Sequence, residues 1–430
     1  MRPVADPHDG TGQIDDQRAQ ARERLGTRAC NNPKSICESE MFDRFFRTKM
    51  PTLLAAACGL IAANVYYAQP LVAPISATIG LPLETAGLIV TMTQLGYGAG
   101  LLLIVPLGDL LENRCLIQVL LAVDALALIG AATSANPLPF LLSALFIGGG
   151  SVAVQVIVPY ATHLLTDDAR GRTIGHVMSG LILGIVLARP AASFIAAVTS
   201  WRLVFALSAL SMATLAWVLG RALPPRHPAA GLRYLELLRS LGRLALTTPA
   251  LRRRALYQAG LFASFSLFWT AVPLRLAEPP YYLSQGGIAI FALAGAAGAA
   301  VAPIAGALAD RGWTRIATGV AMTTVAAALL IAHQAPSNPT VGIGALVLAA
   351  VLLDVGLSVN LILGQRTLFA LGAEVRSRLN GLYVAAFFLS GALGSTLATS
   401  TYARGGWLLA SEVGFTLPLA AIVYYATEFL

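Results

Sequence analysis

The sequence has few charged residues. Asp, Glu, Lys and Arg make up only 12% of the chain, whereas 57% of its 430 residues are hydrophobic. A soluble protein of this length, folded into two or three domains, needs a much more polar surface. The shortage of charge therefore excludes a water-soluble protein and indicates a membrane protein.

Cysteine and histidine are also scarce, and neither forms a cluster. Cys30, Cys37, Cys58 and Cys115 make no CxxC pair, and the five histidines are scattered along the chain. We therefore expect neither disulfides nor a metal site, and a membrane enzyme is disfavoured because its site would need such clusters. The phosphate-binding pattern GxxxxGK[ST] does not occur either, so ATP-driven pumping is disfavoured and no cofactor is expected.

Long uncharged runs predict the membrane spans. A span needs roughly 20 apolar residues, and lipid offers no hydrogen-bond partners to the backbone, so each span is predicted to be a helix. The predicted spans are 52–75, 85–108, 115–134, 138–164, 174–198, 202–221, 255–277, 287–309, 316–334, 340–368, 380–401 and 407–427. The fold class is thus an all-α membrane protein with twelve transmembrane helices.

Arginine is distributed unevenly between the two sides of these spans. The loops on one side contain most of the arginines, whereas the opposite loops contain only Arg202 and Arg404. Because Lys and Arg favour the cytoplasmic side, both termini are predicted to be cytoplasmic. The net charge of +8 then reflects topology and does not indicate nucleic-acid binding.

The spans divide the chain into four parts. These are a tail at 1–50, a six-helix half at 51–221, a cytoplasmic linker at 222–254 and a second six-helix half at 255–430. The tail is polar, lacks the apolar core of a signal peptide and is predicted to be disordered, unless Met41 or Met50 is the true start. In the linker, "LRYLELLRSLGRLAL" (232–246) has charges at helical spacing, which predicts an amphipathic helix on the membrane surface.

The two halves repeat each other. A shift of 201 residues places "PLGDLLENR" (106–114) on "ALADRGWTR" (307–315). A shift of 206 residues places "DARGRTIG" (168–175) on "EVRSRLNG" (374–381). All these matches fall at equivalent loops, so the halves are predicted to be pseudo-symmetric. Duplicated halves of six spans around a central linker are typical of transporters.

These motifs carry a resemblance to the major facilitator superfamily, over about residues 51–430. The superfamily's loop motif between spans two and three, GxLADRxGRR, is similar to "GALADRGWTR" (306–315). The stretches "NVYYAQPLVAP", "TQLGYGAGLLLIVPLGDLLENR" and "GHVMSGLILGIVLARP" resemble a bacterial branch grouped with the twelve-span drug:proton antiporters. The chain departs from that branch in span four, where "LLSALFIGGG" (141–150) lacks the usual arginine, and in span five, where "LARPAAS" replaces the later glycines.

The resemblance implies a cytoplasmic gate, in which the loop motifs hold the ends of the two halves together while the transporter faces outward. The residues that match are Asp109, Arg114, Gly306, Asp310, Arg311, Arg315, Arg170, Arg172, Arg376 and Arg378. We expect Asp109 and Asp310 to accept hydrogen bonds from helix N-termini and from arginines of the opposite half. The alternative is that these charges only set topology and solvate tight turns.

Three charged residues lie well inside predicted spans, away from the span ends, and need an explanation: Asp124, Arg189 and Asp354. Each costs roughly 2.5 to 3.5 kcal/mol at a helix centre, so each requires a reason. The resemblance implies that spans five and ten approach each other, and Arg189 and Asp354 then form a midplane ion pair or take turns binding substrate and proton. The alternative is a purely structural pair. For Asp124 we expect only a buried hydrogen bond.

Uncharged polar residues extend this candidate pathway. Asn64 and Tyr67 share a face of span one, Ser151 and Gln155 share a face of span four, and Ser358 and Gln365 follow Asp354 on span ten. The resemblance implies that spans one, four, seven and ten line the cavity, so these residues are predicted to contact substrate or proton. Helix packing is the alternative, and it is also the favoured role of Phe265, Phe268 and Trp269 in span seven.

The predicted function is secondary active transport by alternating access, with proton-coupled efflux of drugs or metabolites. Uptake or exchange of a sugar or other metabolite, and a sensor that does not transport, are the alternatives. One acid and one base at the midplane favour a neutral, amphipathic or zwitterionic substrate. The expected partners are this small molecule, a coupling proton and the lipid bilayer of the inner cell membrane, with the chain as a monomer.

Overall fold

The computed structural model describes residues 49–429, except 164–166, 229–232, 337 and 373. The predicted disordered tail therefore lies outside the described residues, apart from its last two. The chain divides into two compact units, Met1–Leu53 and Leu54–Leu430, and every contact described below lies within the second.

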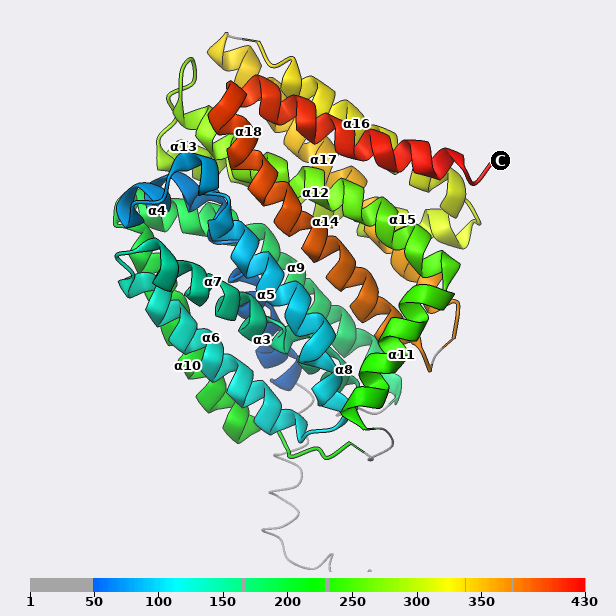
Figure 1. Cartoon of the computed structure of the whole chain (residues 1–430). Helices are drawn as coiled ribbons and strands as arrows, with labels where there is room; N and C mark the ends of the chain where they lie inside the picture. The colour runs from blue at the N-terminus through cyan, green and yellow to red at the C-terminus, as the bar shows by residue number, and fades with distance from the viewer. Residues whose placement is uncertain (1–48, 164–166, 229–232, 337, 373, 430) are drawn as a thin grey trace, which may run out of the picture. The chain divides into compact units, whose positions relative to one another are not determined.

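The first half of the chain is built from helices joined by short turns (Figure 1). They are α3 (Met50–Ala63), η1 (Gln69–Leu71), α4 (Val72–Ile79), η2 (Leu83–Thr85), α5 (Leu88–Leu103), η3 (Val105–Asp109), α6 (Asn113–Thr133), α7 (Pro137–Ser151), α8 (Ala153–His163), α9 (Asp167–Val198) and α10 (Trp201–Ala222). The linker contains α11 (Tyr234–Thr247), whose Leu237 and Leu241 are buried.

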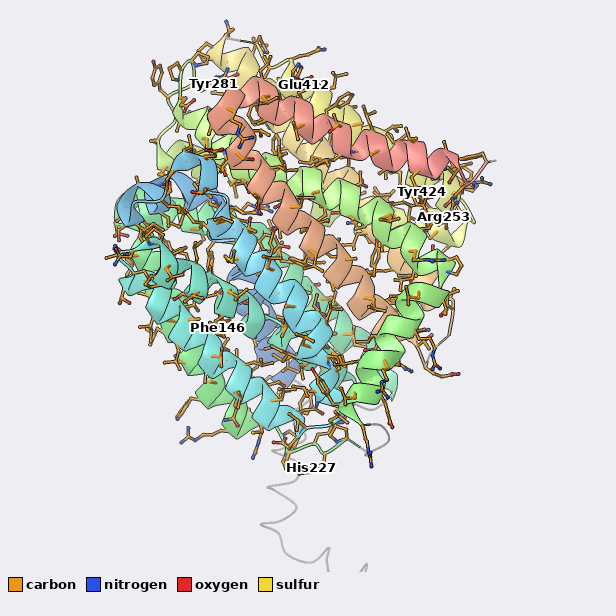
Figure 2. All side chains as sticks on the ribbon, viewed as in Figure 1. Phe146, His227, Arg253, Tyr281, Glu412 and Tyr424 are labelled. Carbon is orange, nitrogen blue, oxygen red and sulfur yellow. The ribbon has the colours of Figure 1, made fainter. Side chains whose placement is uncertain are left out.

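The second half continues in the same way. Its helices are α12 (Pro249–Ala277), α13 (Gln285–Ala292), η4 (Leu293–Ala296), α14 (Ala297–Ala300), α15 (Ala302–Asp310), α16 (Thr314–His333), α17 (Pro339–Phe369) and α18 (Arg376–Ala426). Apolar side chains such as Phe146, 56% exposed, cover outward helix faces, as expected where lipid replaces water (Figure 2).

The predicted spans are present, and the all-α fold class is confirmed. Among the described residues, nine helices are long and apolar enough to cross a membrane. One of them, α18, contains two predicted spans joined at Gly405 and Gly406; Gly406 has φ 62°, a conformation that favours glycine. The two remaining spans are broken into shorter pieces, α3 to α4 and α13 to α15.

Span one breaks earlier than its prolines suggested. Pro70 and Pro74 predict a break near the outer end of this span, because proline lacks a backbone N–H. The structure instead ends α3 at Ala63 and continues as turns through 64–68. Pro70 lies in η1 and Pro74 in the first turn of α4, where a missing N–H costs little. The irregular segment Asn64–Gln69 is therefore a feature of the middle of the span.

Helices α5 and α7 approach each other at glycines. A Cβ atom added to Gly148 would lie 1.9 Å from the carbonyl oxygen of Thr93, and one added to Gly96 would lie 1.9 Å from that of Leu145. Small residues such as those of the run Gly148–Gly150 permit this close helix approach. The same run brings Gly150 against Asp124 of α6, 2.7 Å from its Cβ on the same measure.

The two halves meet along α5 and the first part of α18, which lie side by side (Figure 1). Thr91 Oγ1 lies 2.8 Å from both Ser395 Oγ and Thr396 Oγ1. Beyond it, Arg404 Nη2 lies 2.6 Å from Glu84 Oε1. These contacts, named the α5–α18 seam below, close the molecule at the end that carries Glu84 and Arg404.

Candidate functional site

A buried cation lies where the two halves meet. Arg189 of α9 is only 2% exposed. Its Nε donates a hydrogen bond of 2.7 Å to Gln69 Oε1. The guanidinium carbon lies 4.4 Å from the ring centroid of Trp269, 5.0 Å from that of Phe265 and 5.2 Å from that of Tyr66. Aromatic faces stabilise a cation, and they do so more strongly away from water.

Asp354 of α17 contacts the same tryptophan from a different direction. It is 7% exposed and accepts a 3.0 Å hydrogen bond from Trp269 Nε1. Among the described ion pairs none joins Asp354 to Arg189, so the predicted direct pair is replaced by an indole that both contact. Gln69, Arg189, Trp269 and Asp354, with the rings around Arg189, are named the central cluster below. Helix α9 belongs to the first half and α12 and α17 to the second, so the central cluster bridges the halves.

Two polar atoms of the central cluster have no partner among the described residues. Arg189 Nη2 and Gln69 Nε2 are buried donors without an acceptor. A buried donor left unsatisfied costs about 1 to 3 kcal/mol, so an oxygen that reaches these two groups is stabilised there. The cluster can therefore hold a carbonyl, hydroxyl or carboxylate oxygen at Arg189 and a proton or cation at Asp354.

Broken span eight approaches the central cluster through glycines. A Cβ atom at Gly295 would lie 3.1 Å from Trp269 Cζ2 and 3.3 Å from Arg189 Nη1, and one at Gly298 would lie 2.8 Å from Ser358 Oγ. Ser358, a predicted pathway residue, thus lies against this segment. The backbone of span eight forms a wall of the cluster at Gly295 and Gly298, because these two residues have no side chains.

Asn64 and Ser151, two predicted pathway residues, contact Asp124. Asn64 Nδ2 donates to Asp124 Oδ2 at 2.9 Å and Ser151 Oγ donates to the same atom at 3.3 Å. Ser208 Oγ donates in turn to Asn64 Oδ1. Tyr67 lies close enough to interact electrostatically with Asp124. The buried hydrogen bond expected for Asp124 is confirmed, and Asn64 and Ser151 are oriented toward it.

The remaining predicted pathway residues point elsewhere. Gln155 Nε2 donates to Tyr97 Oη at 3.1 Å, and Gln365 Nε2 donates to Asn380 Oδ1 at 3.1 Å. Asp354 and Gln365, which are predicted to share a polar face of span ten, therefore bind different partners, Trp269 and Asn380.

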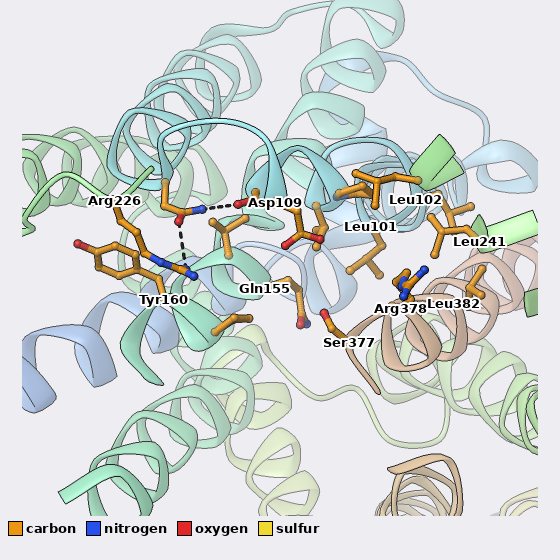
Figure 3. Close-up of a pocket in the computed structure, with 18 residues that line it drawn as sticks. Leu101, Leu102, Asp109, Gln155, Tyr160, Arg226, Leu241, Ser377, Arg378 and Leu382 are labelled. Atoms are coloured by element: carbon orange, nitrogen blue, oxygen red, sulfur yellow. Dashed lines mark hydrogen bonds between the residues drawn. The ribbon is translucent and has the colours of Figure 1, made fainter. Parts of the chain in front are cut away.

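A cavity of about 110 Å³ lies near the C-terminal end of α5. Glu84 and Arg404 of the α5–α18 seam lie at the other end of that helix. Figure 3 shows Asp109, Gln155, Ser377 and Arg378 gathered around it. These side chains come from both halves, and Leu237 and Leu241 of the linker helix complete the wall. Arg378 Nη1 also donates to Ser240 Oγ of α11 at 3.1 Å, so the linker contacts the second half here.

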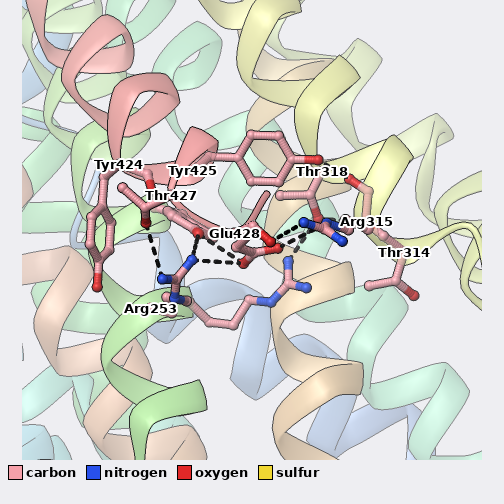
Figure 4. Close-up of polar contacts among 10 residues, drawn as sticks. Arg253, Thr314, Arg315, Thr318, Tyr424, Tyr425, Thr427 and Glu428 are labelled. Atoms are coloured by element: carbon pink, nitrogen blue, oxygen red, sulfur yellow. Dashed lines mark hydrogen bonds and ion pairs between the residues drawn. The ribbon is translucent and has the colours of Figure 1, made fainter. Parts of the chain in front are cut away.

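The predicted gate residues mostly contact their own half. Asp310 forms an ion pair with Arg366 of α17, which belongs to the same half. The expectation that its arginine comes from the opposite half is therefore wrong. Gly306 also lies against Arg366, since a Cβ there would be 3.1 Å from Nη2. Arg315 Nε lies 3.6 Å from Glu428 Oε2 (Figure 4).

The other gate residues contact backbone atoms of their own half or of the linker. Arg114 Nη1 donates to Leu223 O at 3.3 Å and Arg376 Nη2 to Phe369 O at 3.3 Å. Arg311 follows α15 as its C-cap. The side chains of Arg170 and Arg172 lie outside the described residues.

Glu112, beside the gate motif, caps α6. Its carboxylate accepts hydrogen bonds from the backbone N–H groups of Arg114 and Cys115, both at 2.9 Å, and of Arg226 at 3.2 Å. Burial raises the pKa of Glu112, but these hydrogen bonds outweigh it and hold the pKa below its usual value. The ionised carboxylate thus fixes the start of α6 and ties it to the linker.

Sequence reasoning missed several buried polar groups. Gln69 is one, and Gln94, whose Nε2 donates to Ser266 Oγ across the halves at 3.0 Å, is another. Asn360 Nδ2 donates to Gln258 Oε1 at 2.7 Å between α17 and α12. A search for Gln and Asn within apolar runs, where buried amides need partners, would have found all of them.

Two six-helix halves that meet around buried charges define a membrane transporter, and comparison with known proteins agrees. The chain belongs to the Major Facilitator Superfamily, whose sequence model matches residues 54–395. It is 37% identical over 373 residues to "Uncharacterized transporter YgaY" of Escherichia coli, covering 87% of this chain and 94% of the relative. As a multi-pass membrane transporter, it is not an enzyme.

More distant likenesses extend this comparison. The chain is 26% identical over 264 residues to the "Chloramphenicol resistance protein" of Streptomyces lividans, covering 60% of this chain and 66% of the relative. The crystal structure of the nucleoside transporter NupG matches with a TM-score of 0.68 at 13% identity, over 87% of this chain and 99% of that one. The second likeness shows the fold alone.

Proposed function

We propose that this protein is a proton-coupled exporter of small amphipathic or zwitterionic molecules. The observation that carries the proposal is the central cluster, in which Trp269 contacts the cation of Arg189 and the carboxylate of Asp354 without a direct ion pair. Asp354 can then bind a proton or release it while Arg189 stays held by Gln69 and three rings. Exchange of proton for substrate at one buried carboxylate is a route to coupling.

The substrate class follows from the same groups. One buried cation, one carboxylate and an aromatic wall suit a molecule with an apolar body and one or two polar ends. Export of a drug-like compound is supported by the relative named for chloramphenicol resistance. Asn64, Tyr67, Ser151 and Gln155 are proposed to act around this pathway, together with Ser358 and Gln365.

The proposed setting is the inner cell membrane, with both termini cytoplasmic and the chain acting as a monomer. With the arginine-rich loops at the cytoplasmic side, the α5–α18 seam closes the outer side and the cavity at Asp109 and Arg378 faces the cytoplasm. We infer an inward-facing state. In the outward-facing state, Asp109 and Arg378, which come from opposite halves, close this cavity.

Transport in proteoliposomes tests this proposal. An acidic lumen drives accumulation by an antiporter and an acidic exterior drives accumulation by a symporter, so the two gradients separate export from uptake. The panel is chloramphenicol, lipophilic cations, nucleosides, sugars and amino acids. We expect accumulation of at least one amphipathic compound with an acidic lumen only. Accumulation of a sugar or nucleoside with an acidic exterior would contradict the proposal.

Asp354→Asn separates coupling from binding. We expect this variant to lose accumulation driven by the pH gradient but to retain exchange of labelled for unlabelled substrate at equal pH, because only the proton site is removed. Glu412→Gln is the matched control, since Glu412 is an exposed carboxylate on α18 (Figure 2). Full gradient-driven accumulation by a folded Asp354→Asn protein would rule out Asp354 as the coupling residue.

A further inference from the structure

A second buried carboxylate lies outside the central cluster. Asp124, near the middle of α6, is 0% exposed. Its Oδ2 accepts hydrogen bonds from Asn64 and Ser151, and its Oδ1 has no partner among the described residues. None of the described ion pairs includes it. The carboxylate is thus enclosed without a cation.

The helices packed around Asp124 bring few charges to it. Tyr67, beside the end of α3, is the titratable group that interacts with it. The groups facing it from α7 and α10 are the hydroxyls of Ser151 and Ser208, the latter through Asn64. Two arginines of α10, at 202 and 221, lie near the ends of that helix, and Arg202 donates to backbone oxygens at the end of α6.

We propose that Asp124 is a proton-binding site of this transporter, separate from the central cluster. An ionised carboxylate in a dry interior without a cation carries a large desolvation penalty, and binding of one proton removes it. Gly150 packs against Asp124, where an added Cβ would lie 2.7 Å from the Cβ of the aspartate, so little space remains for a larger cation. The ligand that this site accepts is the proton itself.

The hydrogen-bond partners accommodate both protonation states. Ser151 donates its hydroxyl hydrogen to the ionised carboxylate, and the same hydroxyl oxygen can accept a hydrogen bond from the protonated carboxyl. Asn64 Nδ2, by contrast, can only donate, so it stabilises the ionised form more than the neutral one. Proton binding therefore changes the strength of the contact between α6 and Asn64.

That contact leads directly to the central cluster. Asn64 begins the irregular segment Asn64–Gln69, which also contains Tyr66 and Gln69. Tyr66 lies under the guanidinium of Arg189, and Gln69 accepts a hydrogen bond from it. One short segment between α3 and α4 thus contacts Asp124 at its start and Arg189 at its end, and a change in proton occupancy at Asp124 shifts the groups that hold Arg189.

Infrared spectroscopy of the purified protein tests the proton site without any substrate. We expect the wild-type protein to show the C=O stretching band of a protonated carboxyl, with a shift in heavy water. The band should decrease in Asp124→Asn and should keep the Asp124 component in Asp354→Asn and Glu412→Gln. An identical band in wild type and Asp124→Asn throughout a pH titration would overturn the proposal.

A second variant keeps the carboxyl in place. Ser151→Ala removes one hydrogen-bond partner of Asp124, so the frequency of its band should change. This test remains available if Asp124→Asn does not fold. An unchanged frequency in Ser151→Ala would also overturn the proposal.

The link to transport rests on the proposed function and is tested separately. In proteoliposomes, Asp124→Asn should lose accumulation driven by the pH gradient and keep exchange at equal pH. Full gradient-driven accumulation by this variant would overturn the coupling of Asp124 to Arg189. If the wild-type protein accumulates nothing under either gradient yet shows the Asp124 band, the proton site stands and the proposed function fails.

Discussion

Among single residues, Trp269 has the most demanding position in this protein. Its ring face lies against the guanidinium of Arg189, and its N–H donates to Asp354. A ring face attracts a cation and an indole N–H attracts an anion, so one side chain satisfies two opposite charges. These charges are held apart, and in the proposed function each is available to a substrate or a proton.

Trp269→Phe isolates one of these two contacts. Phenylalanine keeps an aromatic face for Arg189 but has no N–H for Asp354. Asparagine at position 354 can still accept this hydrogen bond, whereas phenylalanine at position 269 removes it and frees the ring and the carboxylate to move. A hydrogen bond to a charged group contributes about 1.5 to 3 kcal/mol, so we expect substrate exchange at equal pH to weaken by roughly tenfold to a hundredfold. The KM for exchange in proteoliposomes measures this effect.

Trp217→Phe provides the control for this substitution. Trp217 is 62% exposed on α10, and among the described residues its cation contact is with Arg221 of its own helix. Its loss should leave the KM for exchange unchanged. Equal effects of Trp217→Phe and Trp269→Phe would show that the contact with Asp354 has no special role.

For single residues, the sequence identifies the buried charges of the central cluster better than it identifies the side chains that they contact. Arg189 and Asp354 stand out because a charge in a span needs a reason, and both are buried where the halves meet. The role of Trp269 cannot be read from the chain, because a tryptophan in an apolar helix is usually core packing. The contact between Asn64 and Asp124 could not be predicted either, because the direction in which a residue of one span points depends on the neighbouring helices.

At the scale of helices, the contact between α5 and α7 depends on residues that have no side chain. Gly96 and Gly148 allow each helix backbone to touch the other. Since lipid supplies no hydrophobic driving force between helices, close packing of this kind is a main source of their association.

Gly148→Ala should therefore destabilise the protein. The added methyl group would meet the carbonyl oxygen of Thr93, which is part of a helix backbone and cannot easily move. We expect a cost of about 1 to 3 kcal/mol, typical of overpacking, and hence a lower melting temperature in detergent.

Gly344→Ala is the matched control. Gly344 lies on α17, and an added Cβ there meets no atom within 4 Å. Alanine favours a helix over glycine by up to about 1 kcal/mol, so the melting temperature should stay the same or rise. A fall as large as that of Gly148→Ala would mean that the α5–α7 contact is not the cause.

Most helices could be predicted from the sequence, whereas their interruptions could not. Apolar runs and flanking arginines predict spans such as α6 and α10 closely, because both signals are local. The end of α3 at Ala63 has no such signal, since residues 64–69 contain no charge, glycine or proline. Span eight is rich in small residues, and Pro303 in the first turn of α15 marks the start of that helix but not the division between α13 and α14.

At the scale of the whole molecule, the α5–α18 seam joins the halves at one end and the cavity separates them at the other. An alternating-access cycle requires the seam to open and the cavity to close. The exposed pair of Glu84 and Arg404 contributes little to this balance, because exposed ion pairs add about 0 to 1 kcal/mol. The buried hydroxyls around Thr91 therefore hold the seam.

A cross-link tests whether the seam moves. The hydroxyl oxygens of Thr91 and Ser395 are 2.8 Å apart, so Thr91→Cys with Ser395→Cys places two thiols within reach of a disulfide. In a background without the native cysteines, we expect oxidation to stop substrate exchange and a reducing agent to restore it. Flux before and after oxidation measures this effect.

Each single-cysteine variant controls for oxidation itself and should keep its flux. If the doubly substituted protein is fully cross-linked on a gel and still exchanges substrate, the seam is not part of the moving gate.

The architecture of the molecule could be predicted because the sequence contains an internal repeat. The repeats at 106–114 and 307–315 indicate two halves of six spans each, and the superfamily follows from them. The contact between Thr91 and Ser395, 304 residues apart, could not be predicted. It depends on which of several conformations the halves adopt, and a single sequence encodes all of them.

The position of Trp269 also gives the protein an optical reporter of its own. Indole fluorescence shifts in colour with the local electric field, and here a fixed cation and a carboxylate lie on different sides of the same indole. Any event that neutralises one charge changes that field. With the other four tryptophans replaced by phenylalanine, the emission of this one residue would follow the charge state of the central cluster in real time, without an added dye.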